Sequence, residues 1–163
     1  MKTPVKYQVN KKDSLVNEPI AVYTHQVGMD FLYQDATDDK RVIKLFDTSN
    51  KGLNYTFFEK LSDSVPFSPK EWADFLHLSE RSLNRYKKDH KTFDTTQSEK
   101  LLEIALLFEM GTRVFGSKIY FMTWLETQNI ALNNKMPKEY LTNSFGISLL
   151  KDELTRIEYG ILA

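Results

Sequence analysis

The chain has 163 residues, with 22 basic and 22 acidic side chains and therefore no formal net charge. This balance excludes overall basicity as an argument for nucleic-acid binding and leaves only local concentrations of charge. The absence of cysteine excludes disulfides, thiolate zinc sites and cysteine nucleophiles. The first 17 residues have no apolar centre, and no apolar run is long enough to span a bilayer, so we expect a cytoplasmic protein.

The first 50 residues show no clear periodic pattern. Residues 2–17 are polar, and residues 20–33 mix apolar and polar side chains without a period of 2 or 3.6. Only the stretch from Asp38 to Phe46 favours a helix, with Asp38 or Asp39 as its cap. We therefore treat residues 1–50 as a poorly defined N-terminal arm, which could be flexible, mediate dimerisation or add to the folded core.

From residue 52 onward the sequence predicts helices. One is expected over residues 55–64. A strong helix start follows, in which Ser68 is the cap, Pro69 the first helical residue and Glu71 the residue that can reach back to the cap amide. That helix ends by about residue 78, and Ser79 opens the next one, over residues 80–88.

The second half of the chain is also predicted to be helical. Residues 96–99 resemble a second capping box, with Thr96 as the cap, and open a long helix that is apolar nearly all round and therefore central. Gly116 ends this helix. The remaining predicted elements are helices over 118–126 with Ile119 inward, a loop over 129–137, a short helix to residue 141, and a last helix over 145–159 with Ile157 in the core. The fold class is all-α, with a helix-turn-helix part packed against or followed by a small C-terminal helical domain.

The stretch over residues 68–89 matches a helix-turn-helix, because two short helices are joined there by a three-residue turn. Apolar side chains occupy the positions that fix the angle between the helices, and the small Ala73 stands where the helices approach closely. One departure is His77, at a position where glycine usually supplies a positive φ. Histidine enters that region more readily than most residues, at some cost.

The second helix of this pair would contact DNA. The segment over residues 81–91 carries five Lys or Arg residues and one acid in a chain that is neutral overall. Arg and Asn hold bidentate geometry on guanine and adenine edges, whereas lysines suit phosphates. The alternative is a solvated helix end whose basic residues are favoured by the helix dipole. The predicted DNA-binding residues are Arg81, Ser82, Asn84, Arg85, Lys87, Lys88 and Lys91.

The motifs that follow resemble those of the Xre/MbcA/ParS family of antitoxins, over about residues 52–163. The matching stretches are Gln97 to Leu101, Val114-Phe115-Gly116, Trp124-Leu125, Asn129-x-Ala131-Leu132, and the closing Arg156-Ile157-Glu158-Tyr159-Gly160. Asn133 and Asn134 replace the family's usual glycine pair, and Met136 replaces its common threonine. Asparagine keeps the backbone freedom of that turn.

The resemblance implies a two-part antitoxin that binds two macromolecules. A DNA-binding domain over residues 51–93 would bind the operator of its own operon, and a toxin-binding domain over residues 94–163 would hold a RES-domain toxin. Such a toxin consumes NAD or transfers its ADP-ribose, and the C-terminal region of the antitoxin covers its active-site cleft. We also expect a homodimer, a higher hetero-oligomer with the toxin, and no membrane partner. The implied toxin-binding residues are Asn129, Leu132, Asn133, Asn134, Arg156, Glu158, Tyr159, Gly160 and Ile161.

The sequence contains no pattern typical of an enzyme. Its three histidines are scattered without metal-ligand spacing, and neither a glycine-rich phosphate loop nor a marked Ser, His and Asp set is present. We therefore expect no catalytic residue, metal or cofactor, because the chemistry would belong to the toxin. The alternative function is a stand-alone helix-turn-helix repressor whose C-terminal domain only dimerises. On that alternative Arg156 and Glu158 would belong to a solvated helix end.

Overall fold

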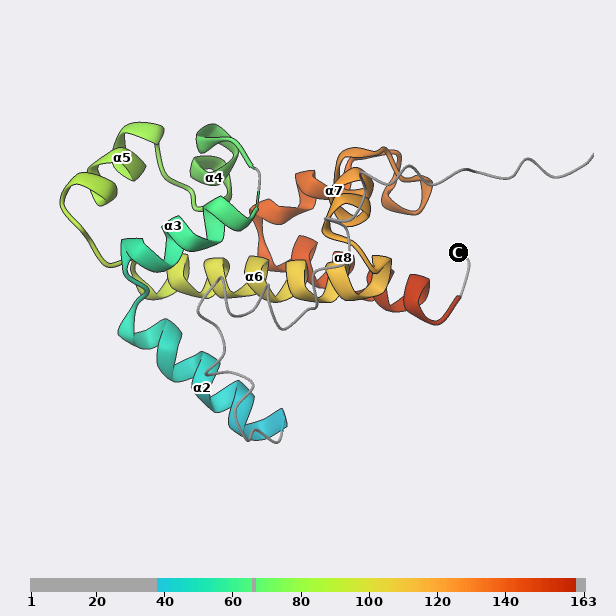
Figure 1. Ribbon diagram of the computed structural model, residues 1–163, viewed down its shortest axis with the longest axis horizontal. Helices are drawn as coiled ribbons and strands as arrows, with labels where there is room; N and C mark the ends of the chain where they lie inside the picture. The colour runs from blue at the N-terminus through green and yellow to red at the C-terminus, as the bar shows by residue number, and fades with distance from the viewer. Residues whose placement is uncertain (1–37, 66, 161–163) are drawn as a thin grey trace, which may run out of the picture.

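The computed structural model describes residues 38–65 and 67–160, and it is all-α over these residues, as predicted. Figure 1 shows the arrangement of the helices. The α-helices are α2 (Asp38–Lys51), α3 (Tyr55–Ser64), α4 (Pro69–Phe75), α5 (Glu80–Lys88), α6 (Thr95–Phe115), α7 (Lys118–Glu126) and α8 (Ser144–Glu158). Two 3-10 helices, η2 (Ile130–Leu132) and η3 (Pro137–Thr142), lie between α7 and α8.

The long helix α6 is the centre of the molecule, as its nearly continuous apolar sequence predicted. Leu101, Ile104 and Leu107 on this helix are fully buried. Helices α3, α4 and α5 lie at one end of α6, α7 lies towards the other end, α8 runs along it, and α2 packs against it at an angle (Figure 1). One core therefore serves both halves of the chain.

The start of α6 differs from the predicted start. Asp94, not Thr96, caps the helix: its Oδ1 accepts a hydrogen bond from the Gln97 backbone N–H at 2.8 Å. The residue before it, Phe93, is 1% exposed, and its backbone N–H donates to the Leu53 carbonyl at 2.8 Å. This long-range contact holds the chain extended up to Asp94, so the helix begins two residues earlier than the local signal indicated.

The helix predicted at Asp38 is confirmed and runs on to Lys51, so the end of the supposed arm is part of the fold. It packs against α6, and Arg41 forms an ion pair with Glu109 on that helix at 3.3 Å. Three large apolar side chains on α2 are exposed: Val42, Ile43 and Phe46. Residues 1–37 lie outside the described part of the chain.

Two side chains that were predicted to be core are exposed. Ile157 is 36% exposed although Ile147, Leu150 and Leu154 on the same face of α8 are fully buried. Figure 1 shows the end of α8 reaching beyond the end of α6, where the burial of this face of α8 decreases. Ile119 is 57% exposed, because it is two residues, or about 200° of helix, from the buried Phe121.

Candidate functional site

Helices α4 and α5 form the predicted helix-turn-helix. The capping box at the start of α4 is confirmed: Ser68 Oγ accepts from the Glu71 backbone N–H at 3.2 Å, and Glu71 Oε2 accepts from the Ser68 backbone N–H at 2.8 Å. Ala73 is buried between the helices, and its carbonyl accepts from the Leu78 N–H at 2.9 Å. His77 has a φ of 53°, so the left-handed turn predicted at this position is present.

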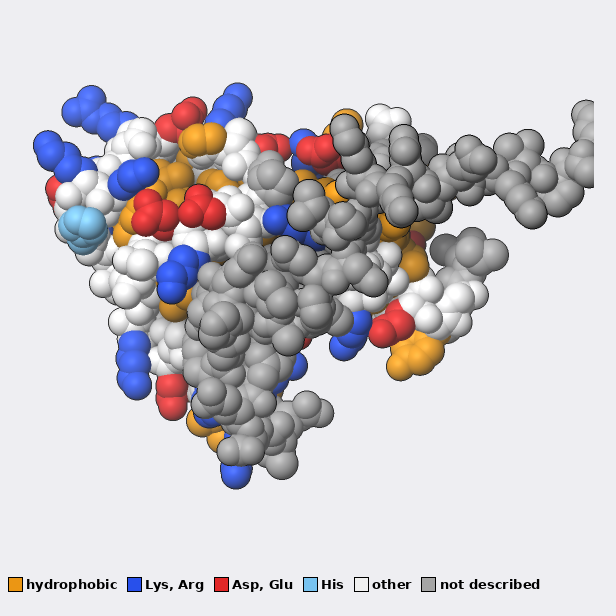
Figure 2. All heavy atoms as spheres, in the orientation of Figure 1, with side chains coloured by type: hydrophobic (Ala, Val, Ile, Leu, Met, Phe, Trp, Pro, Cys, Tyr) orange, Lys and Arg blue, Asp and Glu red, His pale blue; other side chains and the backbone are white. Residues whose placement is uncertain are grey.

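Helix α5 is fixed on one side and open on the other. Leu83 is buried, and Tyr86 stacks on Phe93 with ring centroids 4.8 Å apart. The other side of the helix is hollowed, and five of the predicted DNA-binding residues line the hollow: Arg81, Ser82, Asn84, Arg85 and Lys88. Figure 2 shows Lys and Arg side chains projecting from the end of the molecule where α5 lies. The structure therefore brings together guanidinium, amide and ammonium groups on one exposed face.

The two remaining predicted DNA-binding residues do not line this hollow. Lys87 Nζ lies 3.7 Å from Glu59 Oε1 on α3, and Lys91 Nζ lies 3.7 Å from Asp89 Oδ2. These ion pairs are exposed and therefore weak, so DNA phosphates can compete for both lysines. The sequence grouped all seven residues because it did not reveal which lysines have acidic neighbours.

The loop between α7 and η3 has the backbone that the paired asparagines predicted. Asn133 and Asn134 have φ values of 60° and 57° and are exposed. Asn129 holds the loop closed, since its Oδ1 accepts from the Ala131 N–H at 2.9 Å and its own N–H donates to the Lys135 carbonyl at 3.0 Å. Leu132 is only 2% exposed, so its side chain belongs to the core, and its contact with the toxin stays a prediction.

The end of α8 presents polar and aromatic groups around a left-handed turn. Arg156 Nη1 donates to Glu153 Oε2 at 2.7 Å, and Glu158 Oε1 lies 3.5 Å from Arg113 Nε on α6. Tyr159 is 73% exposed, and Gly160 has a φ of 65°, as expected for the residue that ends a helix. Ile161 and the two residues after it lie outside the described part of the chain.

The two predicted toxin-contact segments lie at the same end of the long axis of the molecule, and α5 lies at the opposite end (Figure 1). Sequence reasoning missed the partner of Arg156, because Glu153 is a charged side chain and was not expected to be 7% exposed. The spacing of three residues on one helix was the available signal for this pair.

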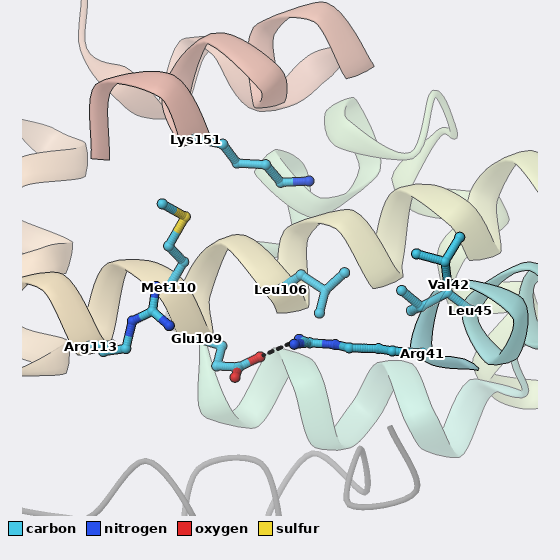
Figure 3. Close-up of a pocket in the computed structure, with 8 residues that line it drawn as sticks. All are labelled: Arg41, Val42, Leu45, Leu106, Glu109, Met110, Arg113 and Lys151. Atoms are coloured by element: carbon cyan, nitrogen blue, oxygen red, sulfur yellow. Dashed lines mark hydrogen bonds and ion pairs between the residues drawn. The ribbon is translucent and has the colours of Figure 1, made fainter. Parts of the chain in front are cut away.

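A third surface is a hollow between α2, α6 and α8, which the sequence did not predict (Figure 3). Leu45, Leu106 and Met110 form its apolar part, and the Glu109 carboxylate points towards Arg41 within it. Burial raises the pKa of Glu109 to about 7, and the positive charge of Arg113 offsets this in part.

Protonation of Glu109 should therefore affect stability. Its pKa is about 7 in the folded chain against an ordinary value of 4.5, so the folded state binds more protons between these values. The Glu109 contribution to the free energy of unfolding should fall as pH rises from 5 to 8. Relative to the wild type, the stability of Glu109→Gln should therefore rise by on the order of 2 kcal/mol between pH 5 and pH 8. The loss of the ion pair with Arg41 adds a constant cost and does not change this direction. Urea denaturation at both pH values measures this, with the exposed Glu99→Gln as the control on the same helix.

The described residues contain no cluster of three or more His, Cys, Asp or Glu side chains that could hold a metal ion. Among the described helices, none combines the length and apolar character needed to cross a bilayer.

Two known domain families match this chain, one over its helix-turn-helix part and one over its C-terminal part. Residues 46–106 match the antitoxin Xre-like helix-turn-helix domain, and residues 110–160 match the antitoxin Xre/MbcA/ParS C-terminal toxin-binding domain. Both matches meet inside α6, downstream of the domain boundary predicted at residues 93 and 94. A search of curated proteins found no match. Neither domain family is enzymatic, and the chain belongs to the Xre/MbcA/ParS family of antitoxins.

Proposed function

We propose that this type II antitoxin neutralises a RES-domain toxin, an enzyme that consumes NAD or transfers its ADP-ribose, by covering the toxin's active-site cleft. We also propose that it represses its own operon through α5. The observation that carries this proposal is the separation of two surfaces at opposite ends of α6. One is the basic hollow of α5, and the other comprises the paired-asparagine loop and the end of α8.

The α5 surface has the chemistry of a DNA reader. Arg81, Asn84 and Arg85 can form bidentate hydrogen bonds with base edges in the major groove, and Lys88 can neutralise a phosphate. Lys87 on the same helix and Lys91 just after it add phosphate contacts. The capping box of α4 and the stacking of Tyr86 on Phe93 hold this helix in a fixed orientation.

The opposite end supplies the proposed toxin contacts. Tyr159 is an exposed aromatic side chain, the kind that anchors protein interfaces, and Arg156 and Glu158 offer charged groups beside it. The other proposed contacts are Asn129, Asn133, Asn134, Gly160 and Ile161. Occlusion by these groups needs neither a catalytic residue nor a cofactor in the antitoxin, since the chemistry belongs to the toxin.

Truncation of the end of α8 tests this function. A chain that ends at Glu158 keeps the buried Leu154 and the ion pair of Glu158 with Arg113, so we expect it to fold. It should lose the Tyr159 anchor and fail to relieve growth arrest when co-expressed with the toxin encoded beside it. Operator footprinting should be unchanged. A truncated chain that still protects cells would contradict the proposed contact at the end of α8. A neighbour that does not consume NAD would contradict the RES-domain toxin, and a full-length chain that relieves no toxicity would favour a stand-alone repressor.

We further propose a homodimer, since helix-turn-helix proteins usually bind two half-sites through a two-fold axis. The exposed row of Val42, Ile43 and Phe46 on α2 is the apolar surface that supports it, and the same contact would build a higher hetero-oligomer with the toxin. Phe46→Glu should weaken dimerisation at least about tenfold, because it places a charge in an apolar contact. Sedimentation equilibrium measures this against Lys60→Glu on the exposed side of α3. Unchanged dimerisation would assign the interface to another surface.

A further inference from the structure

Lys138 connects the toxin-binding domain to the helix-turn-helix. This residue lies on η3, and its Nζ is 3.0 Å from Glu71 Oε1 on α4 and 3.6 Å from Glu126 Oε1 at the end of α7. The chain separates Lys138 from Glu71 by 67 residues. The ammonium group therefore joins three elements from the two family-matched regions.

Each group in this contact stabilises the charged form of the other. The hydrogen bond to Glu71 raises the pKa of Lys138 above its ordinary value. Partial burial acts to raise the pKa of Glu71, but hydrogen bonds from Ser68 and Lys138 bring it below its ordinary value. Both groups are therefore charged at neutral pH, and the pair is an ion pair with a hydrogen bond.

Glu71 uses its two carboxylate oxygens for two purposes. Its Oε2 accepts from the backbone N–H and the Oγ of Ser68, each at 2.8 Å, and so completes the cap of α4. Its Oε1 accepts from Lys138. One side chain therefore contacts both the first turn of α4 and η3, and α4 in turn orients α5.

Lys138 also lies close in sequence to the paired-asparagine loop. The Lys135 carbonyl accepts the hydrogen bond that closes this loop, and Pro137, which begins η3, directly precedes Lys138. Glu126 ends α7 just before the loop begins. A partner that moves the loop or η3 would therefore move the ammonium group that holds α4.

We propose that the contact between Lys138 and Glu71 couples toxin binding to operator binding. The inference rests on the proposed function, since it names how the two binding surfaces influence each other. Toxin bound at the loop changes the position of η3, and Lys138 transmits this change to the first turn of α4. Because such coupling is reciprocal, operator DNA changes toxin affinity by the same factor.

Variants at this contact should fold. The Lys138 and Glu71 side chains are 26% and 30% exposed, so the pair contributes little to the stability of the fold. Lys138→Met removes the charge and keeps the length of the side chain. Lys60→Met is the matched control, because Lys60 is an exposed lysine on α3 that lies outside both proposed binding surfaces.

Operator affinity of the full-length chain, measured by fluorescence anisotropy without toxin and with saturating toxin, tests the proposal. The ratio of the two affinities should differ from one in the wild type. It should move towards one by about two- to fivefold in Lys138→Met, the largest effect expected of a partly exposed ion pair. Lys60→Met should keep the wild-type ratio, and adding Glu71→Gln to Lys138→Met should change it no further.

Two results would overturn the coupling while leaving the proposed function standing. One is a wild-type chain that binds both toxin and operator with a ratio of one. The other is a ratio that is the same in the wild type and in Lys138→Met. A wild-type chain that binds no toxin, or no operator, contradicts the proposed function itself and the coupling with it.

Discussion

Replacing Arg85 with alanine is expected to weaken operator binding by about 10- to 100-fold, the range for loss of one bidentate contact with a base. Arg85 lines the basic hollow of α5 together with Arg81 and Asn84, on the side of the helix opposite the buried Leu83. Its removal leaves the packing of α5 intact. Electrophoretic mobility shift at fixed salt measures the loss, and toxin binding should be unchanged.

Lys87→Ala is the matched control for this result. Lys87 lies on the same helix but pairs with Glu59, so its loss should weaken binding only a few-fold and equally for all DNA sequences. Arg85→Ala should instead reduce the preference for the operator over unrelated DNA. Equal losses in the two variants would show that α5 contacts phosphates alone, and loss of toxin binding in Arg85→Ala would show that the two surfaces are not independent.

Gly146→Ala is expected to destabilise the chain by about 3 kcal/mol or more, beyond the usual cost of an overfilled core. Gly146 lies in the first turn of α8, where a Cβ would overlap the backbone carbonyl of Tyr140. That carbonyl is not free to move, because η3 is packed on α8 and Tyr140 Oη donates to the Leu132 carbonyl at 2.9 Å. Urea denaturation measures the effect.

Gly116→Ala separates this overlap from the general cost of losing a glycine. Gly116 has a φ of 65° and no atom within 4 Å of an added Cβ, so the substitution should cost only about 1 kcal/mol. Gly146→Ala should also abolish toxin neutralisation, because η3 and the loop before it would be displaced. Equal stability losses at the two positions would mean that α8 shifts to accommodate the methyl group.

The sequence predicted those features whose cause lies within one turn of helix. Ser68 and Glu71 are three residues apart, so the capping box between them was visible, and the positive φ of Asn133 followed from the residue type. The cap of α6 was misplaced because Asp94 and Thr96 are both acceptable caps. The choice between them depends on the pairing of Phe93 with Leu53, which is a contact between distant segments.

In the candidate sites too, features with a local cause could be predicted and features that depend on distant segments could not. The residues of α5 were predicted to share a face because helical periodicity places them there. The exposure of Ile157 could not be predicted, since it depends on where α6 ends relative to α8. Nor could the contact of Lys138 with Glu71, because Glu71 already had a local role as a cap and its partner is 67 residues away.

The position of α6 has a consequence for the lifetime of the protein. Phe108 on α6 contacts Phe67 beside the helix-turn-helix at 5.6 Å and Phe121 on α7 at 5.1 Å, measured between ring centroids. The DNA-reading half and the toxin-holding half thus share one core and should unfold in a single cooperative step. A protease that acts on the unfolded chain would then remove both functions at once. Derepression of the operon and release of the toxin would therefore occur at the same rate.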